Sequence, residues 1–155
     1  MNLAIAASLR GTCDRKKVGC VLVIDKRVVA TGYNGALPGA EHCDDVGHDL
    51  VETLDHLGVP KPNCVRTVHA EANCVAIAAR YGIATNGATA YTNTYTCWPC
   101  FRLLVSAGVT RVVFDDGYRV DPRVQETASR LGVLVERIAD ESAAVPHDDA
   151  KCGAV

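Results

Sequence analysis

The pattern of apolar and polar residues changes its period along the chain and predicts an alternation of strands and helices. Short runs rich in β-branched and other apolar residues, bounded by turn residues, are typical of strands. A short helix is expected at residues 2–10, and Asp25-Lys26 is expected to join the first two strands in a hairpin. The predicted strands are residues 19–24, 27–31, 88–94, 109–114 and 133–138.

Three further helices are predicted in the second half of the chain. The alanine-rich run 68–81 ends at Gly82, a favourable residue just after a helix. Runs 97–107 and 122–131 complete the set. Strands that alternate with helices in this way run parallel and are covered by those helices. We therefore expect an α/β fold with a mixed five-stranded sheet whose last strands are parallel.

Residues 36–68 are the least regular part of the chain. Within them, residues 49–57 are expected to form a helix that ends at Gly58 and Pro60. We expect residues 1–138 to form one domain that contains this segment as an insertion. Residues 139–155 are polar and acidic without periodicity, and they are expected to be a disordered tail.

Length and composition narrow the class of protein. A chain of 155 residues suits one domain with its own core. Its net charge of −2 argues against a polynucleotide partner, which needs a basic surface. No apolar run has transmembrane length, and residues 2–7 lack the charged region of a signal peptide. We expect a cytoplasmic protein without a membrane partner, whose eight cysteines are reduced and available to metal.

The chemistry is concentrated in His69-Ala70-Glu71 and in Cys97-Trp98-Pro99-Cys100. One imidazole and two thiolates can hold Zn²⁺ and leave its fourth position open for water. Glu71 lies near enough to move protons without being a ligand. The pattern matches that of the zinc nucleobase deaminases. A lone Cys-x-x-Cys is common in redox and structural sites, but its combination with His-x-Glu, each at the start of a predicted helix, favours catalysis.

This arrangement predicts hydrolytic deamination. Zn²⁺ lowers the pKa of bound water from about 15.7 to about 7 and so supplies hydroxide at neutral pH. With cytosine, that hydroxide would attack C4, while Glu71 protonates N3 and later carries a proton to the departing amine. The helix dipole at the first turn favours the negative charges that this chemistry needs.

Further motifs accompany the two zinc motifs between about residue 9 and residue 118. In chain order the set is Thr12-Cys13, Val18-Gly19, Gly32-Tyr33-Asn34-Gly35-Ala36, Pro38-Gly39, His42-Cys43, Cys64, His69-Ala70-Glu71 with Asn73, Gly87-Ala88-Thr89 with Tyr91, and Cys97 with Cys100. With these motifs in this order, the chain resembles the deoxycytidylate (dCMP) deaminase family, including its bacteriophage and competence-protein-like members. The resemblance implies a three-layer α/β/α cytidine-deaminase-like sandwich that converts dCMP to dUMP with release of ammonia, for thymidylate synthesis.

The resemblance also implies substrate contacts and regulation. Asn34 is expected to contact the sugar and Tyr118 to lie near the substrate, although an Asn in a glycine loop is commonly only a turn residue. Ala70 and Tyr95 are expected to lie against the base or sugar. The family usually forms hexamers, and some members are activated by dCTP and inhibited by dTTP through the region of residues 32–35.

Thr96 departs from the family pattern, which usually has proline before the first zinc cysteine. The preceding Thr92-Asn93-Thr94-Tyr95 also differs from the smaller residues usual there. Because these positions would lie against the substrate, deamination of a 5-substituted dCMP stays open. Arg15, in the basic turn with Lys16 and Lys17, is the candidate phosphate contact.

A second set of metal ligands is expected to attach the insertion at about residues 36–68 to the turn that contains Cys13. Similar sequences often carry a cysteine at the position of His48, and both residue types ligate zinc. We therefore expect one structural zinc in addition to the catalytic one, with His42 as an alternative to His48. The other interpretation is that Cys13 and Cys64 are buried small apolar residues. The expected ligands are Cys13, Cys43, His48 and Cys64.

Two other functions stay open. A deaminase of tRNA or single-stranded nucleic acid shares the zinc chemistry but needs an extended basic surface, which the charge balance and the acidic tail argue against. A non-catalytic zinc-binding module would have no use for Glu71 beside His69.

Overall fold

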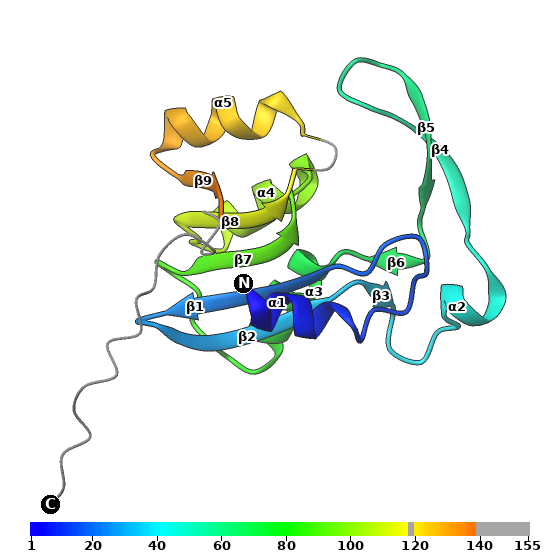
Figure 1. Cartoon of the computed structure of the whole chain (residues 1–155), viewed down its shortest axis with the longest axis horizontal. Coiled ribbons are helices and arrows are strands. Elements are labelled where there is room, and N and C mark those ends of the chain that lie inside the picture. The colour runs from blue at the N-terminus through cyan, green and yellow to red at the C-terminus, as the bar shows by residue number, and fades with distance from the viewer. Residues whose placement is uncertain (118–119, 139–155) are drawn as a thin grey trace, which may run out of the picture.

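The computed structural model describes residues 1–117 and 120–138 and centres on a five-stranded sheet (Figure 1). Its strands are β1 (Gly19–Ile24), β2 (Arg27–Tyr33), β7 (Thr89–Thr94), β8 (Arg111–Asp116) and β9 (Leu134–Arg137). Their order is β2-β1-β7-β8-β9. β1 is antiparallel to both of its neighbours, whereas β7, β8 and β9 are parallel. The predicted mixed sheet with parallel last strands is confirmed.

Asp25 and Lys26 join β1 and β2 in a hairpin, as predicted from the sequence. Asp25 and Lys26 have φ angles of 48° and 62°, the left-handed conformation of a tight two-residue turn that matches the twist of the strands. Tyr33 extends β2 two residues beyond the predicted end, and Asn34 follows it directly.

Helices cover both faces of the sheet. They are α1 (Asn2–Ser8), α3 (Ala70–Arg80), α4 (Trp98–Ser106) and α5 (Pro122–Leu131). Because side chains alternate along a strand, Gly19 of β1 faces α1, while Cys20 packs in the core with α3. α4 contacts both α3 and α5, so these three form the other layer. The three-layer α/β/α sandwich is confirmed, with element bounds within a few residues of those predicted.

Close packing of β2 against α3 sets the position of the α3 N-terminus. A Cβ atom at Gly32 would lie 2.3 Å from the carbonyl oxygen of Ala70 and 2.5 Å from the amide nitrogen of Cys74. The core around this contact is built largely from small side chains, including Ala30, Cys74 and Ala78. The contact between the backbones of β2 and α3 therefore holds His69 and the first turn of α3 in place.

The largest difference from expectation lies in residues 49–64. The predicted helix at 49–57 is wrong, because β4 (Leu50–Leu54) pairs antiparallel with β5 (Pro60–Cys64). The turn between them has Gly58 at a φ of 77°, and the Asp55 carboxylate accepts the backbone N–H of Leu57 and of Val59. This hairpin, residues 50–64, stands away from the central sheet (Figure 1), and we call it the arm.

Short elements connect the arm to the rest of the fold. α2 (Cys43–Val46) precedes the arm, and β3 (Gly35–Ala36) pairs with β6 (Thr67–Val68) on either side of the insertion. Within the described helices, none has both the length and the apolar character needed to cross a membrane. Tyr118 and the expected tail, residues 139–155, lie outside the described residues.

Candidate active site

Two helix starts bring His69, Cys97 and Cys100 together. His69 is the residue before α3, and Cys97 is the residue before α4. The Sγ atoms of Cys97 and Cys100 each lie 3.4 Å from His69 Nδ1. A tetrahedral ion with a Zn–N bond of about 2.0 Å and a Zn–S bond of about 2.3 Å sets such atoms about 3.5 Å apart. The three predicted ligands therefore fit zinc in both chemistry and spacing.

Glu71 lies beside these donors in the first turn of α3 and is 3% exposed. Burial raises its pKa, and the negative charge of Cys97 raises it further. The three-donor group contains His69, Cys97 and Cys100 but not this carboxyl. Its position and its raised pKa are those of a group that can carry a proton beside a metal centre.

The three donors shift one another's pKa values. Hydrogen bonding from Cys100 and then from His69 lowers the pKa of Cys97 to about 4. The Cys97 contact in turn raises the pKa of His69 to about 9, while the pKa of Cys100 is raised by its contact with Cys97 and by burial. A divalent cation would replace the protons that His69 and Cys100 hold here.

A cavity of about 450 Å³ opens beside these residues, a volume typical of small-molecule sites. Four of the predicted substrate contacts line it together with His69 and Glu71: Arg15, Asn34, Ala70 and Tyr95. Sequence reasoning missed Val18 and Asn63, which line the same cavity. Asn63 belongs to the arm, and no local motif indicated that the arm would reach the site.

Asn34 is 8% exposed and ties the turn before β1 to the end of β2. Its amide nitrogen donates to the carbonyl oxygen of Lys16 at 2.8 Å, and its amide oxygen accepts the N–H of Val18 at 2.8 Å. Each amide atom keeps the capacity for one more hydrogen bond. Asn34 therefore shapes the cavity wall and can also face a ligand.

The cationic and aromatic side chains that line the cavity differ in their interactions with the rest of the protein. Lys16 bonds Thr94 and Asp116, each at 2.9 Å, so its ammonium is already paired. Arg15 is exposed at the same cavity. The Tyr95 ring packs edge-on against Phe114, with their centroids 4.9 Å apart, so Tyr95 lines the cavity from within the core.

A second Cys/His cluster forms at the base of the arm. Donor atoms of Cys13, Cys43 and His48 lie within 4.8 Å of one another, and the Sγ atoms of Cys43 and Cys64 are 3.7 Å apart. Two sulfurs bound to one tetrahedral zinc at about 2.3 Å lie about 3.8 Å apart. The cluster therefore fits a metal, and it contains His48 rather than the alternative His42.

His48 is oriented as metal-binding histidines usually are. Its Nε2 lies 2.9 Å from Asp14 Oδ1, and its Nδ1 is buried without a hydrogen-bond partner in the described part of the chain. A ligating imidazole commonly donates its other N–H to a carboxylate. A metal bound to Nδ1 would satisfy this buried nitrogen.

The α/β/α sandwich, with His-x-Glu at one helix start and Cys-x-x-Cys at the next, defines the cytidine-deaminase-like class of proteins. Residues 1–115 match the family model of the cytidine and deoxycytidylate deaminase zinc-binding region. The chain belongs to this family.

Curated relatives agree with this assignment. The chain is 37% identical over 131 residues to ComE operon protein 2 of Bacillus subtilis, covering 84% of this chain and 65% of that protein. It is 38% identical over 117 residues to the deoxycytidylate deaminase of Mycobacterium phage D29, covering 74% and 89%. With the deoxycytidylate deaminase of Schizosaccharomyces pombe, 33% identity covers 88% of this chain and 42% of the relative. The chain thus spans less than two thirds of the Bacillus and Schizosaccharomyces proteins.

Solved structures share the fold. The dCMP deaminase from the cyanophage S-TIM5, crystallised with dCMP and dUMP, superposes with a TM-score of 0.69 at 24% identity, covering 88% of this chain and 92% of that one. The Thermotoga maritima diaminohydroxyphosphoribosylaminopyrimidine deaminase/reductase gives a TM-score of 0.58 at 20% identity, covering 88% and 34%.

Proposed function

We propose that this protein is a zinc-dependent deaminase that hydrolyses dCMP to dUMP and ammonia. The observation that carries the proposal is the meeting of His69, Cys97 and Cys100 at zinc-ligand spacing beside the buried Glu71 and a cavity. Family membership and relatives named deoxycytidylate deaminase support this substrate.

His69, Cys97 and Cys100 would hold the metal, which supplies Lewis-acid activation of water at neutral pH when bound. Glu71 takes a proton from the attacking water, delivers it to N3 of the cytosine and carries a second proton to the leaving amine. One C4–O bond forms and one C4–N bond breaks, so a water is consumed and ammonia leaves. The low-dielectric surroundings of Glu71 favour its neutral form and ease the return of each proton.

Substrate contacts are proposed from the cavity wall. Asn34 and Ala70 border the position of the base and sugar, with Tyr95 behind them. Arg15 is the proposed phosphate contact, because it is exposed at this cavity while Lys16 is held by Asp116. The family resemblance adds Tyr118, which lies outside the described residues.

A structural zinc is proposed for Cys13, Cys43, His48 and Cys64. Its support is the 3.7 Å approach of Cys43 to Cys64 and the buried, partnerless Nδ1 of His48. Fully loaded protein should therefore contain two zinc ions per chain, and Cys64→Ser should contain one. A single zinc in fully loaded wild-type protein would remove the second site.

Assembly, regulation and location are proposed from the family resemblance. The proposed protein is a cytoplasmic homohexamer, and assembly is supported by the apolar side chains of Leu3 on α1 and of Leu9 just after it, which are 60% and 71% exposed. Regulation by dCTP and dTTP is proposed for the region of residues 32–35. Light scattering on the zinc-loaded protein, with and without each nucleotide, measures assembly directly, and a monomer in all three samples would contradict the hexamer.

The substrate is tested by following ultraviolet loss of the cytosine chromophore. The panel is dCMP, CMP, deoxycytidine, 5-methyl-dCMP and a cytosine-containing oligonucleotide. We expect the highest kcat/KM with dCMP, and a loss of about tenfold or more with deoxycytidine, which lacks the phosphate. Turnover of the oligonucleotide alone would overturn the proposal and favour a nucleic-acid deaminase.

A further inference from the structure

A second cavity, of about 430 Å³, adjoins the first and lies against the arm. Both cavities are lined by Asn63, His69 and Cys97, so they meet at the catalytic metal ligands. The arm borders the second cavity with Thr53 and Lys61 in addition to Asn63, and the starts of α4 and α5 border it from the other side. The catalytic ligands are therefore open to a groove that is longer than the first cavity alone.

Strand alternation gives the two faces of the arm different roles. Asn63 and Cys64 are neighbours in β5, so their side chains point to opposite faces of the hairpin. Cys64 is buried with Cys13 and Cys43 at the base of the arm. Asn63 lines both cavities, and Lys61, two residues away on the same face, lines the second cavity. The proposed structural metal thus holds the residue next to Asn63.

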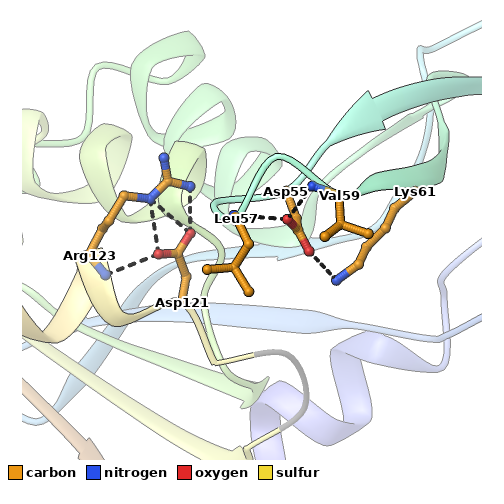
Figure 2. A network of polar contacts seen from close by, with 6 residues as sticks. All are labelled: Asp55, Leu57, Val59, Lys61, Asp121 and Arg123. Atoms are coloured by element: carbon orange, nitrogen blue, oxygen red, sulfur yellow. Dashed lines mark hydrogen bonds and ion pairs between the residues drawn. The ribbon is translucent and has the colours of Figure 1, made fainter.

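An ion pair lies on each side of the second cavity near the tip of the arm. Figure 2 shows the two ion pairs, Asp55 with Lys61 at 2.6 Å and Asp121 with Arg123 at 2.7 Å. The pKa of Arg123 is raised first by Asp121 and further by Asp55, so the charges of the arm and of α5 act on each other. The attraction between Asp55 of the arm and Arg123 of α5 favours an arm that lies over the groove.

We propose that the arm is the outer wall of the substrate groove and that Asn63 is the nucleotide contact it supplies. This inference rests on the proposed function, in which C4 of the base lies at the metal ligands and N3 at Glu71. Because those groups occupy the reacting edge, Asn63 meets the nucleotide elsewhere and contributes binding rather than chemistry. Its amide has no hydrogen-bond partner within the described residues and is free to bond a ligand.

The test compares Asn63→Ala with the wild-type zinc-loaded enzyme. We expect the KM for dCMP and the Kd for dUMP, measured by calorimetry, to rise by about tenfold, the loss of roughly one hydrogen bond. The kcat should stay within about twofold, since the reacting edge is untouched. The matched control is Glu52→Gln, an exposed residue of β4 that lines neither cavity and should change none of these values.

The outcomes separate this inference from the proposed function. If the wild type deaminates dCMP and Asn63→Ala binds dUMP as tightly as the wild type, the role of Asn63 is overturned while the deaminase assignment stands. If the wild type turns over no mononucleotide, the proposed function itself fails. Zinc analysis of each variant confirms that any loss of dUMP affinity occurs in fully loaded protein.

Discussion

At the scale of single residues, Glu71 differs from the other acidic groups because it is buried next to two sulfur ligands. Burial and the charge of Cys97 raise its pKa, which favours its neutral form and prepares it to donate. In the proposed reaction the same carboxyl first accepts a proton, and a group whose pKa is shifted toward the working pH can do both. The raised pKa of Glu71 therefore follows from its location in the buried first turn of α3.

Replacing Glu71 by glutamine should therefore remove turnover without removing metal. The amide has the same shape but cannot carry a proton, so kcat with dCMP should fall by about 10²–10⁴-fold. Zinc content should stay at the wild-type value, because the carboxyl is not one of the three donors. Glu126→Gln, at an exposed position of α5, is the control. Wild-type kcat in Glu71→Gln would refute the proton-carrier role.

Metal binding at the catalytic site should release protons in a defined number. At pH 7 the metal-free site holds one proton on His69, whose pKa is raised to about 9, and one on Cys100, whose pKa is also raised. Cys97, with a pKa of about 4, is already ionised. Zinc binding should then release about two protons, one from each protonated ligand.

Calorimetry in buffers of different ionisation enthalpy measures this release. Cys64→Ser isolates the catalytic site, because it removes a ligand of the proposed structural metal. Release of fewer than one proton per zinc at pH 7 would show that His69 and Cys100 do not hold these two protons.

At the scale of elements, the contact of β2 with α3 positions His69 and Glu71, and Gly32 is the most sensitive point of this contact. Gly32→Ala forces a Cβ to within 2.3 Å of the Ala70 carbonyl oxygen, a backbone atom that cannot rotate away. The free energy of unfolding should fall by about 1–3 kcal/mol, as for other overpacked cores, and kcat should fall with it because His69 and Glu71 move.

Urea unfolding checks this expectation, with Gly117→Ala as the matched control. A Cβ at Gly117 meets no atom of the described residues within 4 Å, and this glycine has no positive φ. An unfolding midpoint for Gly32→Ala equal to that of Gly117→Ala would contradict the proposed tight contact.

The arm tip should respond to pH through Asp55. The hydrogen bond from Lys61, with the backbone N–H groups of Val59 and Leu57, lowers the pKa of Asp55 to about 2 from 3.8. Because the folded pKa is depressed, the stabilisation is present above about pH 4 and is lost as the pH falls toward about 2. Asp55→Asn should behave at pH 7 as the wild type does when Asp55 is protonated.

Amide hydrogen exchange at Leu57 and Val59 measures this effect. We expect faster exchange at both amides in Asp55→Asn at pH 7, with unchanged exchange in β7. Asp45→Asn, in the exposed part of α2, is the control. Equal protection of Val59 in the wild type and in Asp55→Asn would show that the carboxylate does not hold the turn.

The elements also show where sequence reasoning succeeds and where it stops. His69, Glu71, Cys97 and Cys100 were foreseeable because each pair lies within one turn of a helix start, so spacing alone sets its geometry. The helix predicted at 49–57 was wrong because residues 50–54 gain a partner in residues 60–64, and such pairing depends on residues outside the local window. Asn63 was missed for the same reason.

At the scale of the whole molecule, the parallel half of the sheet and the arm together define the site. β7 ends at Thr94, and Cys97, a proposed zinc ligand, follows it before α4 begins, so this part of the proposed site lies at the carboxyl end of a parallel strand. Ligands bind at such ends in open α/β sheets. The arm then adds a wall that the sheet lacks, and the proposed structural metal anchors the base of that wall.

The most direct test of the deaminase account is the reaction of the zinc-loaded protein with dCMP in water labelled with oxygen-18. We expect dUMP with one labelled oxygen at C4, ammonia in equal amount, and loss of both products in Glu71→Gln. Recovery of unchanged dCMP, or of dUMP without the label, would contradict hydrolytic deamination at this site.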